Sequence, residues 1–206
     1  MSKRKPGAYQ RALQLMEGGE VAEAASVLQA AVAERPGDWT LWQLLGNARD
    51  ELEAPERALD AYARALACPD VWEAPVHQNR AVVLERLDRH DQALSEAERA
   101  LADPDREPFE AEALNVAVTC LVELGRPDDA VELARAMLDR CEGNAPKARL
   151  AALHAELAWA LWLAHDDRDA ALAELRAAGR LAPQNPRIHE LLAELGGHRP
   201  SWLPGT

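Results

Sequence analysis

Residues 189–198, HELLAELGGH, begin like the metal-binding helix of a zinc protease. In such a helix the second imidazole ligand stands four residues after the first, so that both point from one face. The position four residues after His189 holds Ala193, and His198 follows only after two glycines. We therefore expect no metal site here and interpret His189 as a surface residue of a terminal helix.

A second polar cluster, AHDDRD at residues 164–169, places His165 beside Asp166 and Asp167. Such a cluster is compatible with acid–base chemistry or with a cation site. It also falls where one helix is expected to end and the next to begin, and aspartate is a common cap for the start of a helix. The position in the pattern favours capping.

Other catalytic signatures are missing from the sequence. It contains no phosphate-binding glycine loop, no GxSxG motif and no cysteine with a basic activator nearby. Cys68, Cys120 and Cys141 are scattered without CxxC spacing, a usage typical of buried thiols in a reducing compartment. We therefore predict a cytoplasmic protein that is not an enzyme and has no catalytic residues, metal or cofactor.

The composition and net charge of the chain indicate a folded helical protein and limit its possible partners. Of the 206 residues, 48% are hydrophobic and 28% charged, which predicts a folded chain rich in helix-forming Ala, Leu, Glu and Arg. The net charge of −12 makes nucleic acid a poor partner. No apolar run approaches the roughly 20 residues that span a bilayer, so no membrane partner is predicted. The basic arm at residues 1–5 is followed by no apolar stretch, which argues against a secretory signal.

A repeat runs along most of the chain. Five alanines align at intervals of 34, 35, 37 and 41 residues, each within a helix-like segment. They are Ala24, Ala58, Ala93, Ala130 and Ala171. Twelve residues before the first three stand small residues, namely Ala12, Gly46 and Ala81, which would let two helices of a hairpin approach closely. Proline follows four of the five segments, where it prevents the helix from continuing; these are Pro36, Pro69, Pro104 and Pro183.

The second unit carries the pattern most fully, in Trp42, Leu45, Gly46, Ala58, Tyr62, Ala65 and Pro69. With these residues the chain resembles the tetratricopeptide repeat family over about residues 6–185. The resemblance implies an all-α fold, a right-handed α-solenoid of about five helical hairpins with a C-terminal capping helix. It implies little about function, because such repeats serve many pathways. The fifth unit departs from the pattern, since Trp159 stands where a small residue is expected.

The expected organisation follows from the repeat. Arm 1–5 precedes repeats at about 6–38, 39–70, 71–105, 107–144 and 147–185, then a capping helix at 186–197 and a tail at 198–206. The expected helix pairs are 7–17 with 20–34, 39–52 with 55–67, 72–87 with 90–102, 107–124 with 127–141, and 147–164 with 168–181.

In such an array the first helices line a groove suited to a peptide. The helical period predicts that polar residues of the second, third and fourth units face this groove. They are Gln43, Asn47, Asp50, Gln78, Asn79, Glu85, Glu112, Asn115 and Thr119. The amides among them offer both donors and acceptors to a peptide backbone. The alternative, that they are merely solvated polar residues, stays open.

Some members of the family grip a C-terminal carboxylate with Lys, Arg and Asn from successive repeats. Asn47 and Asn79 match the asparagines of that clamp, but Gln43, Glu112 and Val116 replace its cations. Without cations the charge-assisted bonds to a carboxylate are lost. The resemblance therefore disfavours a chaperone-tail partner, and the acidic groove predicts a neutral or basic segment.

The leading hypothesis is a non-enzymatic adaptor that binds a peptide segment of a partner protein in the groove. Two alternatives remain. One is a self-assembling scaffold that stacks through its ends, to which Trp159 and Trp162 of the fifth unit would contribute. The other is a regulatory subunit of a separately encoded enzyme. The sequence predicts no oligomeric state.

Overall fold

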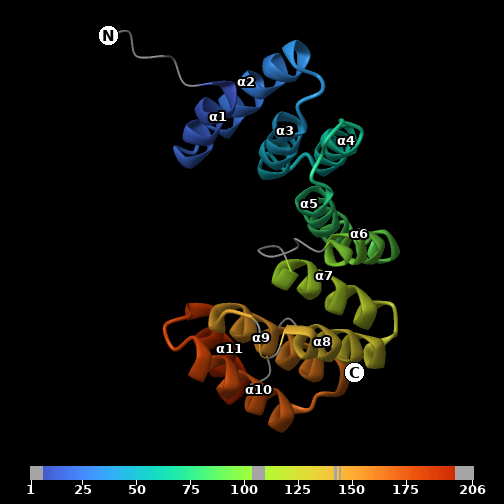
Figure 1. Ribbon diagram of the computed structural model, residues 1–206, viewed down its shortest axis with the longest axis vertical. Helices are drawn as coiled ribbons and strands as arrows, with labels where there is room; N and C mark the ends of the chain where they lie inside the picture. The colour runs from blue at the N-terminus through green and yellow to red at the C-terminus, as the bar shows by residue number, and fades with distance from the viewer. Residues whose placement is uncertain (1–6, 104–109, 142, 144, 198–206) are drawn as a thin grey trace. The chain divides into compact units, whose positions relative to one another are not determined.

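Eleven α-helices make up the part of the chain that the structure describes. This computed structural model describes residues 7–103, 110–141, 143 and 145–197. The helices are α1 (Ala8–Glu17), α2 (Val21–Glu34), α3 (Trp39–Glu51), α4 (Pro55–Leu66), α5 (Glu73–Arg86), α6 (His90–Ala102), α7 (Glu110–Glu123), α8 (Pro127–Cys141), α9 (Lys147–His165), α10 (Arg168–Leu181) and α11 (Pro186–Gly197). They form two compact units that divide between Phe109 and Glu110 (Figure 1).

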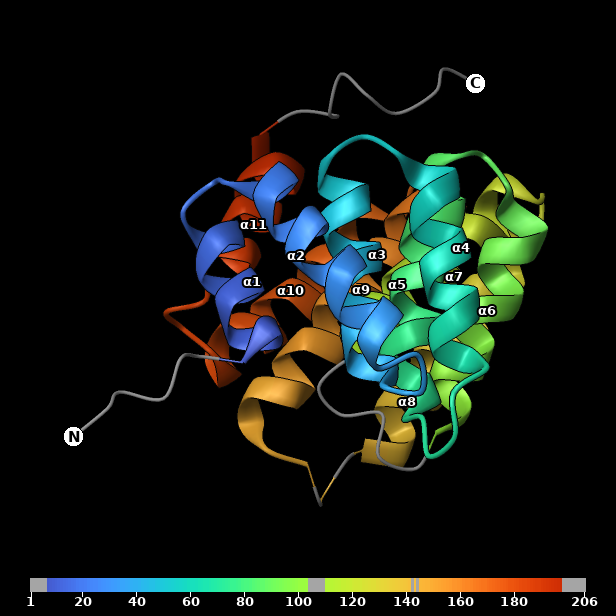
Figure 2. The same cartoon turned by 90° about the horizontal axis from the view of Figure 1, so that it is seen from above.

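The first unit is a stack of three helical hairpins, α1–α2, α3–α4 and α5–α6. Each second helix also packs against the first helix of the next hairpin, so that α2 contacts α3 and α4 contacts α5 (Figure 2). The first helices of successive hairpins contact one another as well, α1 with α3 and α3 with α5. The polar residues of α3 and α5 are thereby brought onto one shared surface.

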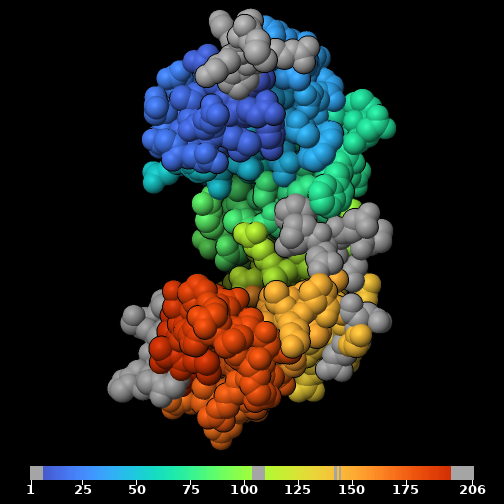
Figure 3. Space-filling view, turned by 60° about the vertical axis from the view of Figure 1, so that its left-hand side comes forward, coloured from blue at the N-terminus to red at the C-terminus, as the bar shows by residue number. Residues whose placement is uncertain are grey.

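The second unit contains two hairpins and a terminal helix. Helix α9 packs against both α8 and α10, and it also contacts the first helix α7. Helix α11 packs on α10, and the two form one packed surface, orange to red, in Figure 3. The buried side chains of Ile188, Leu191 and Leu195 give α11 an apolar stripe at helical spacing. This is the arrangement expected of a helix that covers the last hairpin.

Small residues hold the two helices of each hairpin close together. The five aligned alanines are all fully buried at 0% exposure, as are Ala12 and Ala81. At Gly46, an added Cβ would lie only 2.2 Å from Cε1 of Tyr62, so any larger residue would collide with the ring. Tyr62 is itself 2% exposed. The packing role predicted for these residues is confirmed.

The turns that join the two helices of each hairpin also repeat along the chain. A residue with positive φ lies five positions before each aligned alanine, and these residues are Gly19, Glu53, Asp88, Gly125 and Asp166. In the first four turns the next N–H donates to the carbonyl five residues upstream of itself, as from Glu20 to Leu15. This bond is typical of the Schellman motif, which satisfies the last carbonyls of a helix.

The fifth turn differs from the other four, and Trp159 lies in the helix that precedes it. Helix α9 continues to His165, directly before the left-handed Asp166, and the N–H of Asp166 donates to Trp162. The hairpin thus has one more helical residue before its turn. Ala158, one position before the tryptophan that the alignment placed at the packing position, is a small residue with 0% exposure. Trp159 is buried nonetheless and packs edge-on against Trp162, with ring centroids 5.8 Å apart.

The predicted all-α solenoid of helical hairpins is confirmed, and the helix bounds agree with the sequence patterns to within two residues wherever the chain is described. The basic arm at 1–5, Pro104, His198 and the tail at 198–206 lie outside the described residues. The division into five repeats at the stated bounds stays a prediction. None of the described helices combines the length and the apolar composition that crossing a bilayer requires.

Candidate functional site

The first candidate site is the surface shared by α3 and α5, where two predicted asparagines meet. The Tyr62 hydroxyl donates to Oδ1 of Asn47 at 2.9 Å, and Nδ2 of Asn79 donates to the same oxygen at 3.0 Å. Burial, reinforced by the charge of Asp50, raises the pKa of Tyr62, so its hydroxyl stays protonated and remains a donor. These two bonds orient the Asn47 amide.

The orientation leaves complementary groups for a ligand. Within the described part of the chain, Nδ2 of Asn47 and Oδ1 of Asn79 form no hydrogen bond to protein. Both side chains are partly exposed. One free donor and one free acceptor on neighbouring helices match the C=O and N–H of a peptide backbone.

Charge on this surface is largely balanced. Asp50 of α3 forms an ion pair with Arg86 of α5, so one carboxylate predicted to repel acidic ligands is neutralised within the protein. Glu85 and Gln43 are partly exposed and remain accessible. Gln78 is the exception among the predicted residues: only 4% of it is exposed, so it offers a ligand little surface.

In the second unit, the surface of α7 and α9 carries the remaining predicted residues. Nδ2 of Asn115 donates to Oε2 of Glu156 at 2.9 Å, a residue that the sequence patterns did not single out. Burial raises the pKa of Glu156 to about 7, against the opposing effects of the Asn115 hydrogen bond and the more distant charge of Arg187. On the same helix as Asn115, Thr119 is partly exposed and Glu112 is exposed. The structure thus divides the predicted set between two units, each described by itself.

A buried polar cluster between α5 and α6 was also missed. Nδ1 of His77 lies 2.6 Å from Oε2 of Glu96, and both residues are less than 8% exposed. Arg80 and Arg99 lie 3.5 and 3.7 Å from Oε1 of Glu96. Burial by itself would raise the pKa of Glu96, but the His77 hydrogen bond and the two arginines lower it below its usual value.

The same pair recurs in the fifth hairpin. Nδ1 of His154 lies 2.7 Å from Oε2 of Glu174. Each histidine stands four residues before the small packing residue, Ala81 or Ala158, and each glutamate stands three residues after the aligned alanine. Both pairs could have been found by comparing polar residues at equivalent positions of the repeats. For the fifth hairpin, the first helix would have to be shifted by one residue in that comparison. Both pairs join the two helices of a hairpin and are structural.

Asp167 and His189, which the sequence offered as candidates for catalysis or metal binding, form ordinary structural contacts. Oδ1 of Asp167 accepts from the N–H of Ala170 at 3.0 Å, so the capping interpretation is confirmed. Nε2 of His189 lies 2.7 Å from the carbonyl oxygen of Pro183. Among the described residues, no three His, Cys, Asp or Glu side chains gather in a way that would hold a metal ion. Cys68, Cys120 and Cys141 are all buried.

Several solved structures have the same fold as this chain. The chain is similar to the crystal structure of YrrB, a protein with tetratricopeptide repeats and an unusual peptide-binding site (20% identity, 89% of each chain covered, TM-score 0.58). It is also similar to PilW, a widely conserved type IV pilus biogenesis factor (18% identity, 93% of this chain and 86% of that chain, TM-score 0.68). A third is a tetratricopeptide repeat protein from Parabacteroides merdae (18% identity, 92% and 73% covered, TM-score 0.66). At these identities the likeness concerns the fold.

No protein of curated function matches the chain. The family model for the tetratricopeptide repeat, in contrast, matches residues 9–71 and 79–145. These stretches cover most of the first four hairpins, whose turns share one geometry, and they stop before the fifth, whose turn differs. With its paired helices, its buried small residues and this match, the chain belongs to the tetratricopeptide repeat family.

Proposed function

We propose that the protein is a non-enzymatic adaptor that binds an extended peptide segment of a partner protein on the surfaces of its first helices. The family is one of protein–protein interaction modules, and the single observation that supports the peptide hypothesis is the Asn47–Asn79 pair. Its free donor and free acceptor complement one backbone amide whatever side chain that residue bears.

The preferred segment is neutral or basic. On the α3–α5 surface, Arg86 already neutralises Asp50, and Glu85 has no charge partner among the residues that the structure describes, which favours a neutral or weakly basic ligand. On the α7–α9 surface, exposed Glu112 adds a negative charge that a lysine or arginine of the ligand would compensate. We place this activity in the cytoplasm, because three buried thiols that form no disulfide suit a reducing compartment.

The test is affinity capture from the source cell with two variants and matched controls. Asn47→Asp keeps the oxygen that accepts from Tyr62 but removes the free N–H, and Asn79→Ala removes the free oxygen. Gln92→Glu and Gln92→Ala make the same chemical changes at an exposed amide of the second helix α6. We expect the partner signal, quantified by mass spectrometry, to fall about tenfold for the asparagine variants, which corresponds to the loss of one or two buried hydrogen bonds.

The controls should capture as well as the original protein, and circular dichroism should show unchanged helicity in all four variants. Equal capture by Asn79→Ala and the original chain would overturn the proposed binding surface.

A further inference from the structure

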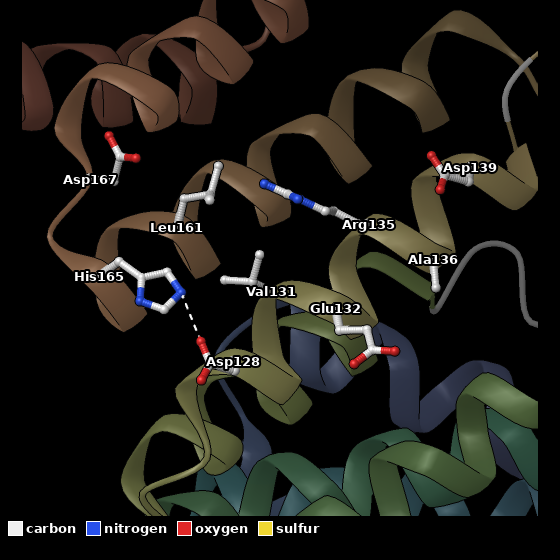
Figure 4. A pocket seen from close by; sticks show the side chains of 9 residues that line it. All are labelled: Asp128, Val131, Glu132, Arg135, Ala136, Asp139, Leu161, His165 and Asp167. Atoms are coloured by element: carbon white, nitrogen blue, oxygen red, sulfur yellow. Dashed lines mark ion pairs between the residues drawn. The ribbon is translucent and has the colours of Figure 1, made fainter.

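A second surface of the second unit has the form of a binding groove. It is a hollow of about 620 Å3 lined by α8, by the end of α9 and by Asp167 ahead of α10 (Figure 4). This volume lies within the range of roughly 300–1,000 Å3 typical of ligand sites. We call it the α8 groove; its lining residues are Asp128, Val131, Glu132, Arg135, Ala136, Asp139, Leu161, His165 and Asp167.

The α8 groove is distinct from the surface proposed above. Glu156 and His165 are nine residues apart on α9. At roughly 100° per residue they point to opposite sides of the helix. A ligand in the groove therefore cannot reach Glu156 or Asn115, and the two surfaces can be occupied independently.

The groove combines an apolar floor with an acidic rim. Val131 and Leu161 are 7% and 5% exposed and form the floor. Four carboxylates line the rim, opposed by one guanidinium, that of Arg135, and by the imidazole of His165. Nε2 of His165 lies 3.4 Å from Oδ1 of Asp128, the pair that Figure 4 marks by a dashed line.

Two of these carboxylates have no charge partner in the part of the chain that the structure describes. Among the described residues, neither Glu132 nor Asp139 comes within 4.0 Å of a basic nitrogen, although Arg135 stands on the same helix. Figure 4 shows the Arg135 side chain directed toward α9 and away from both carboxylates. The rim therefore presents uncompensated negative charge next to buried aliphatic side chains.

The spacing along α8 sets the length of a matching ligand. Asp128, Glu132 and Asp139 lie four and eleven residues apart, within about 40° of one face of the helix. Eleven residues of helix span roughly 16 Å, the length of about five residues of extended chain. An acidic segment would be repelled, and a wholly apolar one would leave the rim carboxylates unpaired.

We propose that the α8 groove binds a second partner segment, about five extended residues long, with Lys or Arg near both ends and an aliphatic side chain between them. The aliphatic side chain contacts Val131 and Leu161, and the basic ends pair with the carboxylates of α8. This site lies outside the function proposed above and does not depend on it.

The experiment measures fluorescence anisotropy of a labelled peptide, GRALARG, blocked at both ends, with the full chain at low salt. Glu132→Lys combined with Asp139→Lys should weaken binding at least about tenfold, because two charge contacts become repulsive. The matched control, Glu17→Lys with Glu34→Lys, changes the net charge equally at exposed positions of the first unit and should bind within about twofold. A peptide with serine in place of leucine, GRASARG, should bind several-fold more weakly because it leaves the apolar floor uncovered.

Two results would overturn the proposal. If the groove and control variants weaken binding equally, the peptide is held only by general charge attraction. If the two peptides bind with equal affinity, Val131 and Leu161 do not contribute to binding. Asn115→Ala changes a residue of α7 whose partner, Glu156, lies on the side of α9 opposite to the groove, and it should leave GRALARG binding unchanged. The two proposed sites therefore succeed or fail separately.

Discussion

Two glutamates, one in each unit, show how strongly the partners of a buried carboxyl decide its charge. Glu96 of α6 faces His77, Arg80 and Arg99, and its pKa lies below the usual value in spite of burial. Glu156 of α9 receives one hydrogen bond from the neutral amide of Asn115, and its pKa rises to about 7. Both lie on helices of similar hairpins, so the contrast follows from the side chains around them and not from the fold.

The two carboxyls therefore respond to pH in opposite directions. The contribution of Glu96 to stability is present above the usual carboxyl pKa and is lost as the pH falls through its lowered value. Glu156 binds a proton in the folded chain between its ordinary pKa of 4.5 and about 7, so stability falls as the pH rises through that window. Four variants test the comparison, in order of decreasing effect.

Replacing Glu96 should have the largest effect. Glu96→Gln leaves His77, Arg80 and Arg99 without their shared carboxylate, and we expect a loss of about 3 kcal/mol in the free energy of unfolding at pH 7. Urea denaturation measures this loss. The difference from the original chain should shrink as the pH falls below the usual carboxyl pKa, because the unfolded chain then binds a proton that the folded chain does not. A loss that stays constant down to pH 3 would contradict an ionised Glu96.

The corresponding change in the second unit should have the opposite sign. Glu156→Gln removes a buried carboxyl whose charged form is unfavourable, so the variant should be more stable by about 2 kcal/mol at pH 8 and equal to the original chain near pH 4. The measurement is urea denaturation at several pH values. Destabilisation at pH 8 would show that Glu156 has a cationic partner and would break the comparison.

The hydrogen bond of Glu156 can be tested by itself. Asn115→Ala removes the one group among the described residues that stabilises the charged form of Glu156 at hydrogen-bond distance, so we expect a loss of about 1 kcal/mol at pH 8 and a smaller loss at pH 5. Carbon-13 NMR of the Glu156 carboxyl should show a pKa above that in the original chain. An unchanged titration would mean that the amide contributes nothing to the carboxylate.

Replacing Glu174 of the His154–Glu174 pair should have the smallest effect on the free energy of unfolding. It also serves as the control for the Glu96 prediction. It repeats the geometry of His77–Glu96, but 29% of the Glu174 side chain and 17% of that of His154 are exposed. Glu174→Gln should cost about 0.5 kcal/mol at pH 7, since water replaces part of what is lost. A loss as large as that of Glu96→Gln would show that the arginines around Glu96 matter less than the histidine.

Much of the fold was readable from residue types at fixed intervals. Alanine at each close approach, glycine against the Tyr62 ring and proline beyond the second helices depend on local geometry, so the helix bounds and the family followed from the pattern. The fifth hairpin fits the pattern less well: α9 runs on to His165, directly before Asp166, and a fully buried small residue, Ala158, stands one position before Trp159. An alignment at constant spacing cannot detect such a shift.

The candidate sites were only partly readable. Helical periodicity brought Asn47 and Asn79 to one surface, and it also included Gln78, which is buried. It had no means of pairing Asp50 with Arg86 or Asn115 with Glu156, because these contacts join different hairpins, 36 and 41 residues apart. The sequence by itself determined the helices, their pairing and the small residues between them, since these depend on backbone geometry and local volume. Only the tertiary structure decided which polar groups are neutralised, buried or left free for a ligand, because that depends on which side chains from separate hairpins come within hydrogen-bond distance.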